Sequence, residues 1–323
     1  MTQESHVKTW SPRSGLPVLT DPIFIGGVPR SGTTVVGKRL LGRHREVACT
    51  VPAEMWFLTD TGGVCDMAAR GSNQRWYRKA QVNALRRKRL TPIAAFQERM
   101  QGFWYARPWW KDGRDKGLCE SISRQDLAAS LEIYRERDRE DPIRAARLLV
   151  ADIIDPQIRE RGKIRWVDTT PANATRIDAL YAVFPDLRLV NMIRDGRDVA
   201  ASIVSRGWGT DDYDRALLQW RDLMIRNHEA AQRIPADRVH HVRLEELVGE
   251  SAESVYTDML SFLGLSSTRK MKRFFLNRIS PEAGHVGRWR SDVEPDELTR
   301  IDQKYAQMIR ELGQRGVPLP AGC

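Results

Sequence analysis

The sequence has few cysteines and no long apolar run. Its 323 residues include four cysteines, Cys49, Cys65, Cys119 and Cys323, without the Cys-x-x-Cys or Cys/His spacing that holds zinc. Free thiols in a reducing compartment are expected. No stretch reaches the ~18 uninterrupted apolar residues of a membrane span, and residues 1–20 lack the apolar core of a secretory signal. We therefore expect a cytoplasmic protein without a metal site or a membrane anchor.

Acidic residues are scarce in one part of the chain. Lys and Arg number 52 against 42 Asp and Glu, which gives a net charge of +10. Residues 70–116 hold 13 Lys and Arg but only three acids, a surplus as large as that of the whole chain. Such an excess indicates an anionic partner. The basic run at 86–89 (RRKR) is also compatible with a membrane surface or a nucleic acid, and four residues are too few to decide.

Short apolar runs alternate with helical patterns along most of the chain. Repeated strand-then-helix units favour an α/β fold of three layers, similar to P-loop proteins, in which helices flank a central parallel sheet. Thr170 and Pro171 are placed to cap and begin one helix, and Gly313 to end another. We predict strands at 23–27, 47–53, 164–167, 187–193 and 239–244, and helices at 172–183 and 295–312.

Residues 55–161 interrupt this alternation. They show helical periodicity at 122–137 and 143–158 but no convincing buried strand. We interpret them as a helical insertion that covers the carboxyl edge of the sheet and, with it, the active site. The chain then forms a single domain over residues 21–315, with flexible ends at 1–20 and 316–323.

The segment 27–34 (GVPRSGTT) carries the most informative pattern. It follows the first predicted strand and precedes a helix, and Gly27 and Gly32 have the G-x-x-x-x-G frame of a phosphate-binding loop. Thr33 replaces the lysine of a nucleoside-triphosphate loop. Arg30 is the available cation, and its planar guanidinium suits an oxyanion that is held without a metal bridge.

Three segments together resemble the sulfotransferases that use 3′-phosphoadenosine-5′-phosphosulfate (PAPS). Residues 24–34 (FIGGVPRSGTT) resemble the family's 5′-phosphosulfate loop, and residues 190–202 (VNMIRDGRDVAAS) its 3′-phosphate segment. Residues 287–290 (GRWR) resemble the segment that folds over the donor. The resemblance, which extends in part to the tyrosylprotein sulfotransferase branch, implies in-line transfer of a sulfuryl group from PAPS to an acceptor hydroxyl. The product would be 3′,5′-adenosine diphosphate (PAP).

The resemblance also assigns roles to single residues. In the family, the residues that match Arg194 and Ser202 bind the donor's 3′-phosphate, and Arg288 with its neighbour Trp289 would contact the same end. Two anion sites at the carboxyl ends of neighbouring strands fit such a donor. Alone, residues 194–197 would fit a helix-capping turn with surface charges equally well. The 5′-phosphosulfate would be held by Arg30, Ser31, Gly32, Thr33 and Thr34.

Sulfuryl transfer requires stabilisation of the leaving oxygen and a base for the acceptor hydroxyl. Arg30, Thr33 and Thr34 are placed for the first role, and no metal is expected. Glu54 follows the predicted strand 47–53, and related sulfotransferases, including the tyrosylprotein branch, carry a glutamate base in this position. The alternative for Glu54 is a carboxylate that stabilises the start of a helix.

One position departs from the family pattern. Many relatives have a lysine before the Thr-Pro of the segment that matches residues 166–171 (WVDTTP), and it assists the leaving oxygen. This sequence has Thr169 there, so Arg30 or another group must supply the charge. His285 precedes the 287–290 segment and ranks below Glu54 as a base.

Two other functions remain open at this stage. A phosphate-loop kinase or nucleotidase would require magnesium, and Thr33 argues against it. A basic protein that binds nucleic acid or membrane surfaces would show strongly salt-dependent binding to polyanions and no response to the sulfate donor. The acceptor would be a small molecule, a carbohydrate or a lipid. Most aromatic and basic residues within 55–161 fit the core and the solvated face of a helical subdomain, and some of them would line a pocket for an aromatic or anionic acceptor. No nucleic acid partner is expected.

Overall fold

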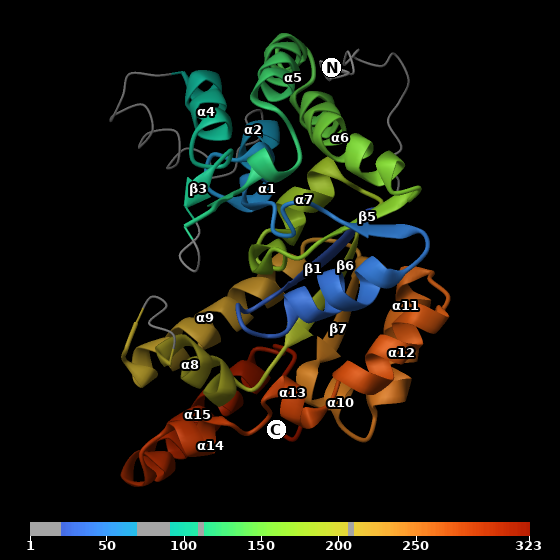
Figure 1. The fold of residues 1–323 in the computed structure, drawn as a ribbon. Coiled ribbons are helices and arrows are strands. Elements are labelled where there is room, and N and C mark those ends of the chain that lie inside the picture. The colour runs from blue at the N-terminus through green and yellow to red at the C-terminus, as the bar shows by residue number, and fades with distance from the viewer. Residues whose placement is uncertain (1–20, 70–90, 109–112, 206–209) are drawn as a thin grey trace.

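A computed structural model describes residues 21–69, 91–108, 113–205 and 210–323 (Figure 1). Its centre is a parallel sheet of five strands in the order β2-β5-β1-β6-β7. The α/β class expected from the alternating pattern is confirmed. The strands of this sheet are β1 (Ile23–Gly27), β2 (Val47–Cys49), β5 (Arg165–Asp168), β6 (Arg188–Ile193) and β7 (Val239–Arg243). A separate antiparallel pair consists of β3 (Arg107–Pro108) and β4 (Asp115–Lys116).

Helices surround the sheet on both faces (Figure 1). None of those within the described residues is long and apolar enough to cross a membrane. The α-helices are α1 (Trp56–Thr59), α2 (Val64–Ala68), α4 (Pro92–Gln101), α5 (Arg124–Arg137), α6 (Pro142–Glu160), α7 (Ile177–Val183), α8 (Gly196–Val204), α9 (Tyr213–Ala231), α10 (Leu244–Val248), α11 (Ala252–Leu263), α12 (Arg269–Arg278), α13 (Pro281–Gly284), α14 (Trp289–Asp292) and α15 (Pro295–Gln314). The others are a π-helix, η1 (Val35–Leu40), and the 3-10 helices η2 (Leu41–Arg43), η4 (Leu118–Glu120), η5 (Pro171–Asn173) and η6 (Ala236–Arg238).

The two faces of the sheet pack against different helices. Successive side chains of a strand point to opposite faces, and in β1 both directions are buried. Phe24 belongs to a cluster with Trp166 and the helices of the insertion, whereas Ile25 packs with η1, α11 and α12. Burial on both faces is typical of parallel sheets between helical layers.

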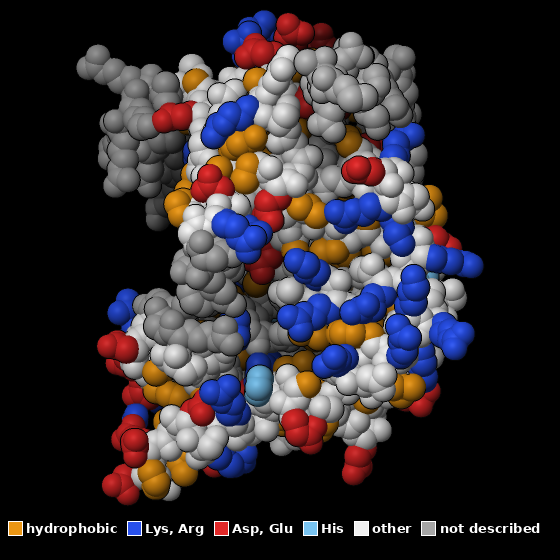
Figure 2. Space-filling model, in the orientation of Figure 1, with side chains coloured by type: hydrophobic (Ala, Val, Ile, Leu, Met, Phe, Trp, Pro, Cys, Tyr) orange, Lys and Arg blue, Asp and Glu red, His pale blue; other side chains and the backbone are white. Residues whose placement is uncertain are grey.

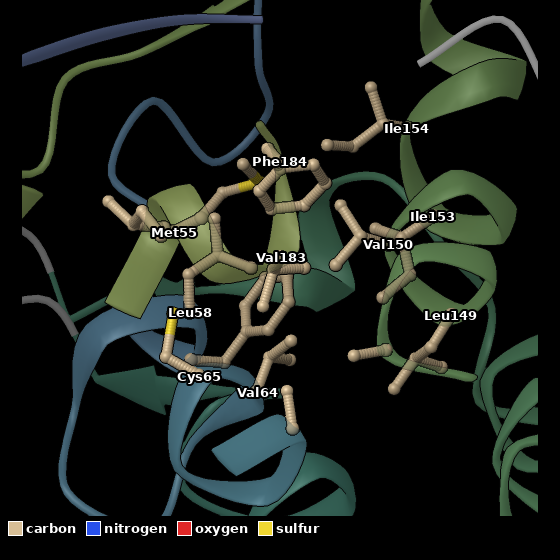
Figure 3. Close-up of a cluster of buried hydrophobic side chains, with 14 of the residues drawn as sticks. Met55, Leu58, Val64, Cys65, Leu149, Val150, Ile153, Ile154, Val183 and Phe184 are labelled. Atoms are coloured by element: carbon tan, nitrogen blue, oxygen red, sulfur yellow. The ribbon is translucent and has the colours of Figure 1, made fainter. Parts of the chain in front are cut away.

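The insertion shares one continuous core with the sheet. Figure 3 shows part of it, where Leu58 of α1 and Val150 of α6 meet Phe184 beyond α7. The insertion therefore packs against one face of the sheet, while its expected position over the carboxyl edge stays a prediction. The predicted helices 122–137 and 143–158 correspond to α5 and α6. Residues 1–20 and the basic run at 86–89 lie outside the described residues.

Two element boundaries differ from the prediction because of contacts distant in the sequence. β2 ends at Cys49 and not at 53, because Val51 exchanges hydrogen bonds with the Gln157 side chain of α6 (2.8 and 3.0 Å). The predicted helix 172–183 is divided into η5 and α7, and the Thr170 hydroxyl makes no capping bond.

The C-terminus also differs from the prediction. Helix α15 continues past Gly313, and Gly316 takes the left-handed conformation after its end (φ 69°). The following residues, expected to be flexible, pack against the protein. Val317 is buried, and the carbonyl of Leu319 accepts a hydrogen bond from Arg243 Nε at 2.7 Å.

Candidate active site

The loop between β1 and η1 has a backbone that few residues adopt. Gly27 has φ 140°, and a Cβ atom there would lie 2.3 Å from the carbonyl oxygen of Met192. Gly32 has φ 94°, and Arg30 itself has φ 76°, which is uncommon for a residue other than glycine. Strained residues of this kind gather at binding and catalytic sites.

This loop presents hydrogen-bond donors. Within the described residues, the N–H groups of Gly32, Thr33 and Thr34 donate to no backbone acceptor, as expected for the first turn of a helix. The Ser31 hydroxyl is fully buried and has no hydrogen-bond partner among these residues. Such a set of donors at a helix start is suited to an anion.

Residues from three distant segments line one cavity of about 210 Å³. Arg30 Nε donates to Ser202 Oγ at 2.9 Å, although the two are 172 positions apart. Arg194 Nη1 donates to the carbonyl oxygen of Arg30 at 2.9 Å. The structure thus joins the loop after β1 to the start of α8. The lining residues are Arg30, Arg194, Asp198, Ala201, Ser202, Ser205, His285, Arg288 and Asp292.

Arg194 is the buried cation of this cavity. Its Nη2 donates to the carbonyl oxygens of Gly284 and His285, both at 3.0 Å. Its Nε is buried without a partner among the described residues. Burial lowers the pKa of the guanidinium, and the nearby Asp198 opposes this change. A guanidinium remains charged in proteins, so the cavity holds a fixed positive charge.

Asp198 fixes the C-terminal segment over the cavity, and the sequence analysis missed it. Its carboxylate accepts hydrogen bonds from the N–H groups of Gly287 (2.8 Å) and Trp289 (3.0 Å). Its spacing of four residues from Arg194 within a helical pattern was the available signal. These bonds bring Arg288 to the cavity, where its half-exposed side chain pairs with Asp292 at 2.9 Å.

The indole of Trp289 lies elsewhere. It is buried in a cluster with α8, α9 and α15, and it is not among the residues that line the cavity. Arg197 lies over its ring at 4.6 Å. Trp289 therefore anchors the segment that carries Arg288, while a direct contact with a donor stays a prediction.

Glu54 follows Ala53 and precedes the short helix α1. Burial raises the pKa of its carboxyl to about 7, and the negative charge of Asp168 contributes to this rise. Arg107, the Trp56 side chain and Arg30 act in the opposite direction. A carboxyl with this pKa is close to half ionised at neutral pH, which suits proton transfer. Arg107, on strand β3 of the insertion, was not expected near this residue.

The segment that carries Glu54 is held by the residues that follow β5. Asp168 Oδ2 accepts a hydrogen bond from Met55 N at 2.7 Å. The backbone N–H of Thr169 and its hydroxyl both donate to the carbonyl oxygen of Ala53, at 2.9 and 2.8 Å. The Thr169 hydroxyl is therefore used to position this segment. The residues before and after Glu54 are thus held by hydrogen bonds to their main-chain groups, so the position of Glu54 in the fold is well defined.

A family model described as "Sulfotransferase family" matches residues 22–269. The chain belongs to this family. The matched part of this sulfotransferase includes Glu54, the loop after β1 and the Arg194 segment, and it ends before Arg288. Among curated proteins, no sequence matches it.

Several solved structures are similar to this sulfotransferase. The sulfotransferase domain of the Synechococcus PCC 7002 olefin synthase shares 17% identity, with 94% of this chain and 98% of that chain covered (TM-score 0.49). Sulfotransferase STF9 from Mycobacterium avium shares 18% identity over 94% and 79% of the two chains (TM-score 0.45). A sulfotransferase from Alicyclobacillus acidocaldarius shares 14% identity over 91% and 94% (TM-score 0.43).

Proposed function

We propose that this sulfotransferase moves a sulfuryl group from PAPS to the hydroxyl of a small molecule, a carbohydrate or a lipid. The proposal is supported above all by the convergence of Arg30, Arg194, Ser202 and Arg288 on one cavity. The guanidinium groups of Arg194 and Arg288 and the Ser202 hydroxyl suit a phosphate group, because guanidinium groups bind its oxygens through charged, often bidentate hydrogen bonds. Arg30 connects this cavity to the loop after β1.

Two unpaired buried groups support the fit to this donor. Buried polar atoms in native proteins nearly always have a hydrogen-bond partner, yet Arg194 Nε and Ser31 Oγ have none among the described residues. A ligand with an anionic group at each end would supply acceptors to both. In this assignment Arg194, Ser202 and Arg288 hold the 3′-phosphate. The 5′-phosphosulfate is held by Arg30, Ser31, Gly32, Thr33 and Thr34.

Glu54 is the proposed base, and Arg30 is the proposed cation that stabilises the leaving oxygen. When bound, PAPS supplies the sulfuryl group, and the sulfur–oxygen bond to its phosphate breaks as the bond to the acceptor oxygen forms. Glu54 takes the proton of the acceptor hydroxyl. Arg30 and the loop N–H groups stabilise the charge on the leaving oxygen. Thr169 stands where many relatives have a lysine, and its uncharged hydroxyl donates a hydrogen bond to the carbonyl oxygen of Ala53. Arg30 therefore supplies the charge that the lysine provides in those relatives.

Calorimetric titration with PAP tests the donor assignment. We expect binding that is independent of magnesium and about tenfold weaker in Arg288→Ala, because one charged hydrogen bond is worth about 1.5 to 3 kcal/mol and half-exposed Arg288 falls at the low end. Arg290→Ala is the matched control. Arg290 belongs to the same short segment, but it lies over the Trp289 ring and does not line the cavity.

Other outcomes of the same titration would overturn the proposal. Stronger binding of ATP with magnesium than of PAP would favour a kinase or nucleotidase. Absence of PAP binding, together with salt-dependent binding of DNA or anionic vesicles, would favour a basic surface-binding protein. Equal effects of Arg288→Ala and Arg290→Ala would remove Arg288 from the donor site.

Asp168 is proposed as a positioning residue for Glu54. In Asp168→Asn, the midpoint of the pH profile of single-turnover transfer is expected to move to lower pH. The neutral amide removes a negative charge that raises the pKa of Glu54. Its single oxygen can replace only one of the two acceptors, because Oδ2 accepts from Met55 N and Oδ1 accepts from Thr170 N and Asn173 Nδ2, so some loss of rate through the fold is expected as well. A slower variant with an unchanged midpoint would mean that Asp168 acts only through the fold.

A further inference from the structure

A second cavity, of about 310 Å³, lies beside the edge strand β2. Its walls come from η1, η2, β2, the residues after β2, η4 and the end of α6. Lys and Arg side chains gather on this side of the molecule, over η1, β2 and α12 (Figure 2). The charged lining residues are Lys38, Glu120, Arg161 and Lys163.

The positive charge of this cavity is not neutralised within the described residues. Arg161 Nη1 donates to the carbonyl oxygen of Cys49 at 2.9 Å, and Lys163 Nζ to that of His44 at 2.7 Å. Glu120, the single acid in the lining, is already paired with Lys116 at 2.8 Å. No carboxylate in the described part of the chain forms an ion pair with any of the three lining cations. They are therefore available to attract an anion.

The cavity is adjacent to the proposed base. Val51, Pro52 and Ala53 form one of its walls, and Glu54 is the next residue. The lining also includes Lys38 of η1, the helix that begins directly after Thr34 of the phosphate loop. A molecule seated there would contact the segment that leads to the proposed base and the helix that follows the proposed donor loop.

We propose that this cavity binds an anionic group of the acceptor, so that the acceptor is a hydroxyl compound that also bears a carboxylate, sulfate or phosphate. The inference rests on the proposed function, because it takes Glu54 as the base. The volume lies at the lower end of the ~300–1,000 Å³ range of small-molecule sites. Lys38 would contribute most freely, because its exposed ammonium makes no hydrogen bond or ion pair within the described residues.

Selenate, a tetrahedral dianion with an anomalous signal, is a suitable probe. In crystals of the full chain grown with PAP and soaked with selenate, we expect a selenium peak among Lys38, Arg161 and Lys163. Equilibrium dialysis of labelled selenate against PAP-saturated protein should show about tenfold weaker binding in Lys38→Gln, since one charged contact is lost. The matched control is Arg39→Gln, an exposed cation of the same helix that does not line the cavity.

The proposal would be overturned by absence of a selenium peak in this cavity. Equal losses of selenate affinity in Lys38→Gln and Arg39→Gln would also overturn it, because they would indicate an effect of general surface charge only. A peak with weak, unsaturable dialysis binding would mean binding at crystal concentration only, and it would also overturn the proposal. The same soak is repeated with crystals grown without PAP, so that the selenium position is determined independently of the nucleotide. Failure of PAP to bind would then reject the proposed donor, while presence or absence of the selenium peak still decides the proposal for the cavity.

Transfer assays then test the acceptor role. With labelled PAPS and pairs of hydroxy acids and their neutral amides, the acids should react faster in the wild-type protein. This preference should fall about tenfold in Lys38→Gln and persist in Arg39→Gln. Amides that react as fast as the acids would show that the cavity does not select the acceptor.

Discussion

Glu54→Gln is expected to slow single-turnover sulfuryl transfer by roughly 10²–10⁴-fold, the range that a well-placed general base contributes. The glutamine side chain is close in size and keeps a polar end, but it cannot take the proton of the acceptor hydroxyl. Binding of PAP should change little, because Glu54 is assigned to the acceptor and not to the nucleotide. Rapid-quench measurement with enzyme in excess over donor separates the chemical step from product release.

The pH profile gives this prediction a second readout. Only the ionised carboxylate can act as the base, and the pKa of Glu54 is raised to about 7. The wild-type rate should therefore rise with pH, reach half its maximum near pH 7 and level off above it. In Glu54→Gln, this dependence should disappear.

Glu54→Gln is expected to slow the reaction without unfolding the protein. The substitution removes the cost of ionising a buried carboxylate, so the unfolding temperature near neutral pH should be unchanged or higher. Glu46→Gln is a suitable control, because Glu46 lies at the other end of β2 and, within the described residues, its carboxylate forms an ion pair only with the neighbouring Arg45 on the surface. A Glu54→Gln rate within threefold of the wild type would remove Glu54 from the role of base.

The sequence predicted most strands of the central sheet because their signals are local. β1 occupies the predicted residues, and β6 and β7 each differ from the prediction by one residue at an end, since apolar runs and the glycines or charges that follow them mark their limits. β2 was predicted four residues too long. Its end depends on Gln157, which is 106 positions from Val51 and belongs to another layer. A single-sequence pattern does not carry such a contact.

The candidate site divides in a similar way. Arg30, Arg194, Ser202 and Arg288 could be named because each belongs to a short motif with a family resemblance, and the fold brings all four to one cavity. Asp198 acts through backbone N–H groups 89 and 91 positions away, and Arg107 reaches Glu54 from the insertion. Their contributions depend on tertiary placement. The spacing of Asp198 from Arg194 does not reveal its two N–H partners, and no local pattern places Arg107 near Glu54.

Arg194→Ala is expected to weaken PAP binding by about 10- to 100-fold, which corresponds to the loss of one charged hydrogen-bond pair of about 1.5 to 3 kcal/mol. The same guanidinium also donates to the carbonyl oxygens of Arg30, Gly284 and His285. A weaker affinity alone would therefore not show whether Arg194 contacts the nucleotide or only orders the two segments around it.

A comparison of PAP with adenosine 5′-monophosphate, which lacks the 3′-phosphate, separates these two roles of Arg194. If Arg194 binds the 3′-phosphate, the wild-type preference for PAP should largely disappear in Arg194→Ala, while affinity for the monophosphate changes little. The preference of Arg194→Lys for PAP should lie between those of the wild type and Arg194→Ala, because an ammonium keeps the charge but not the planar fork. An equal loss of affinity for both nucleotides would mean that Arg194 acts through the bonded segments alone. The 3′-phosphate would then need another ligand, and Arg288 would be the first cation of this cavity to test.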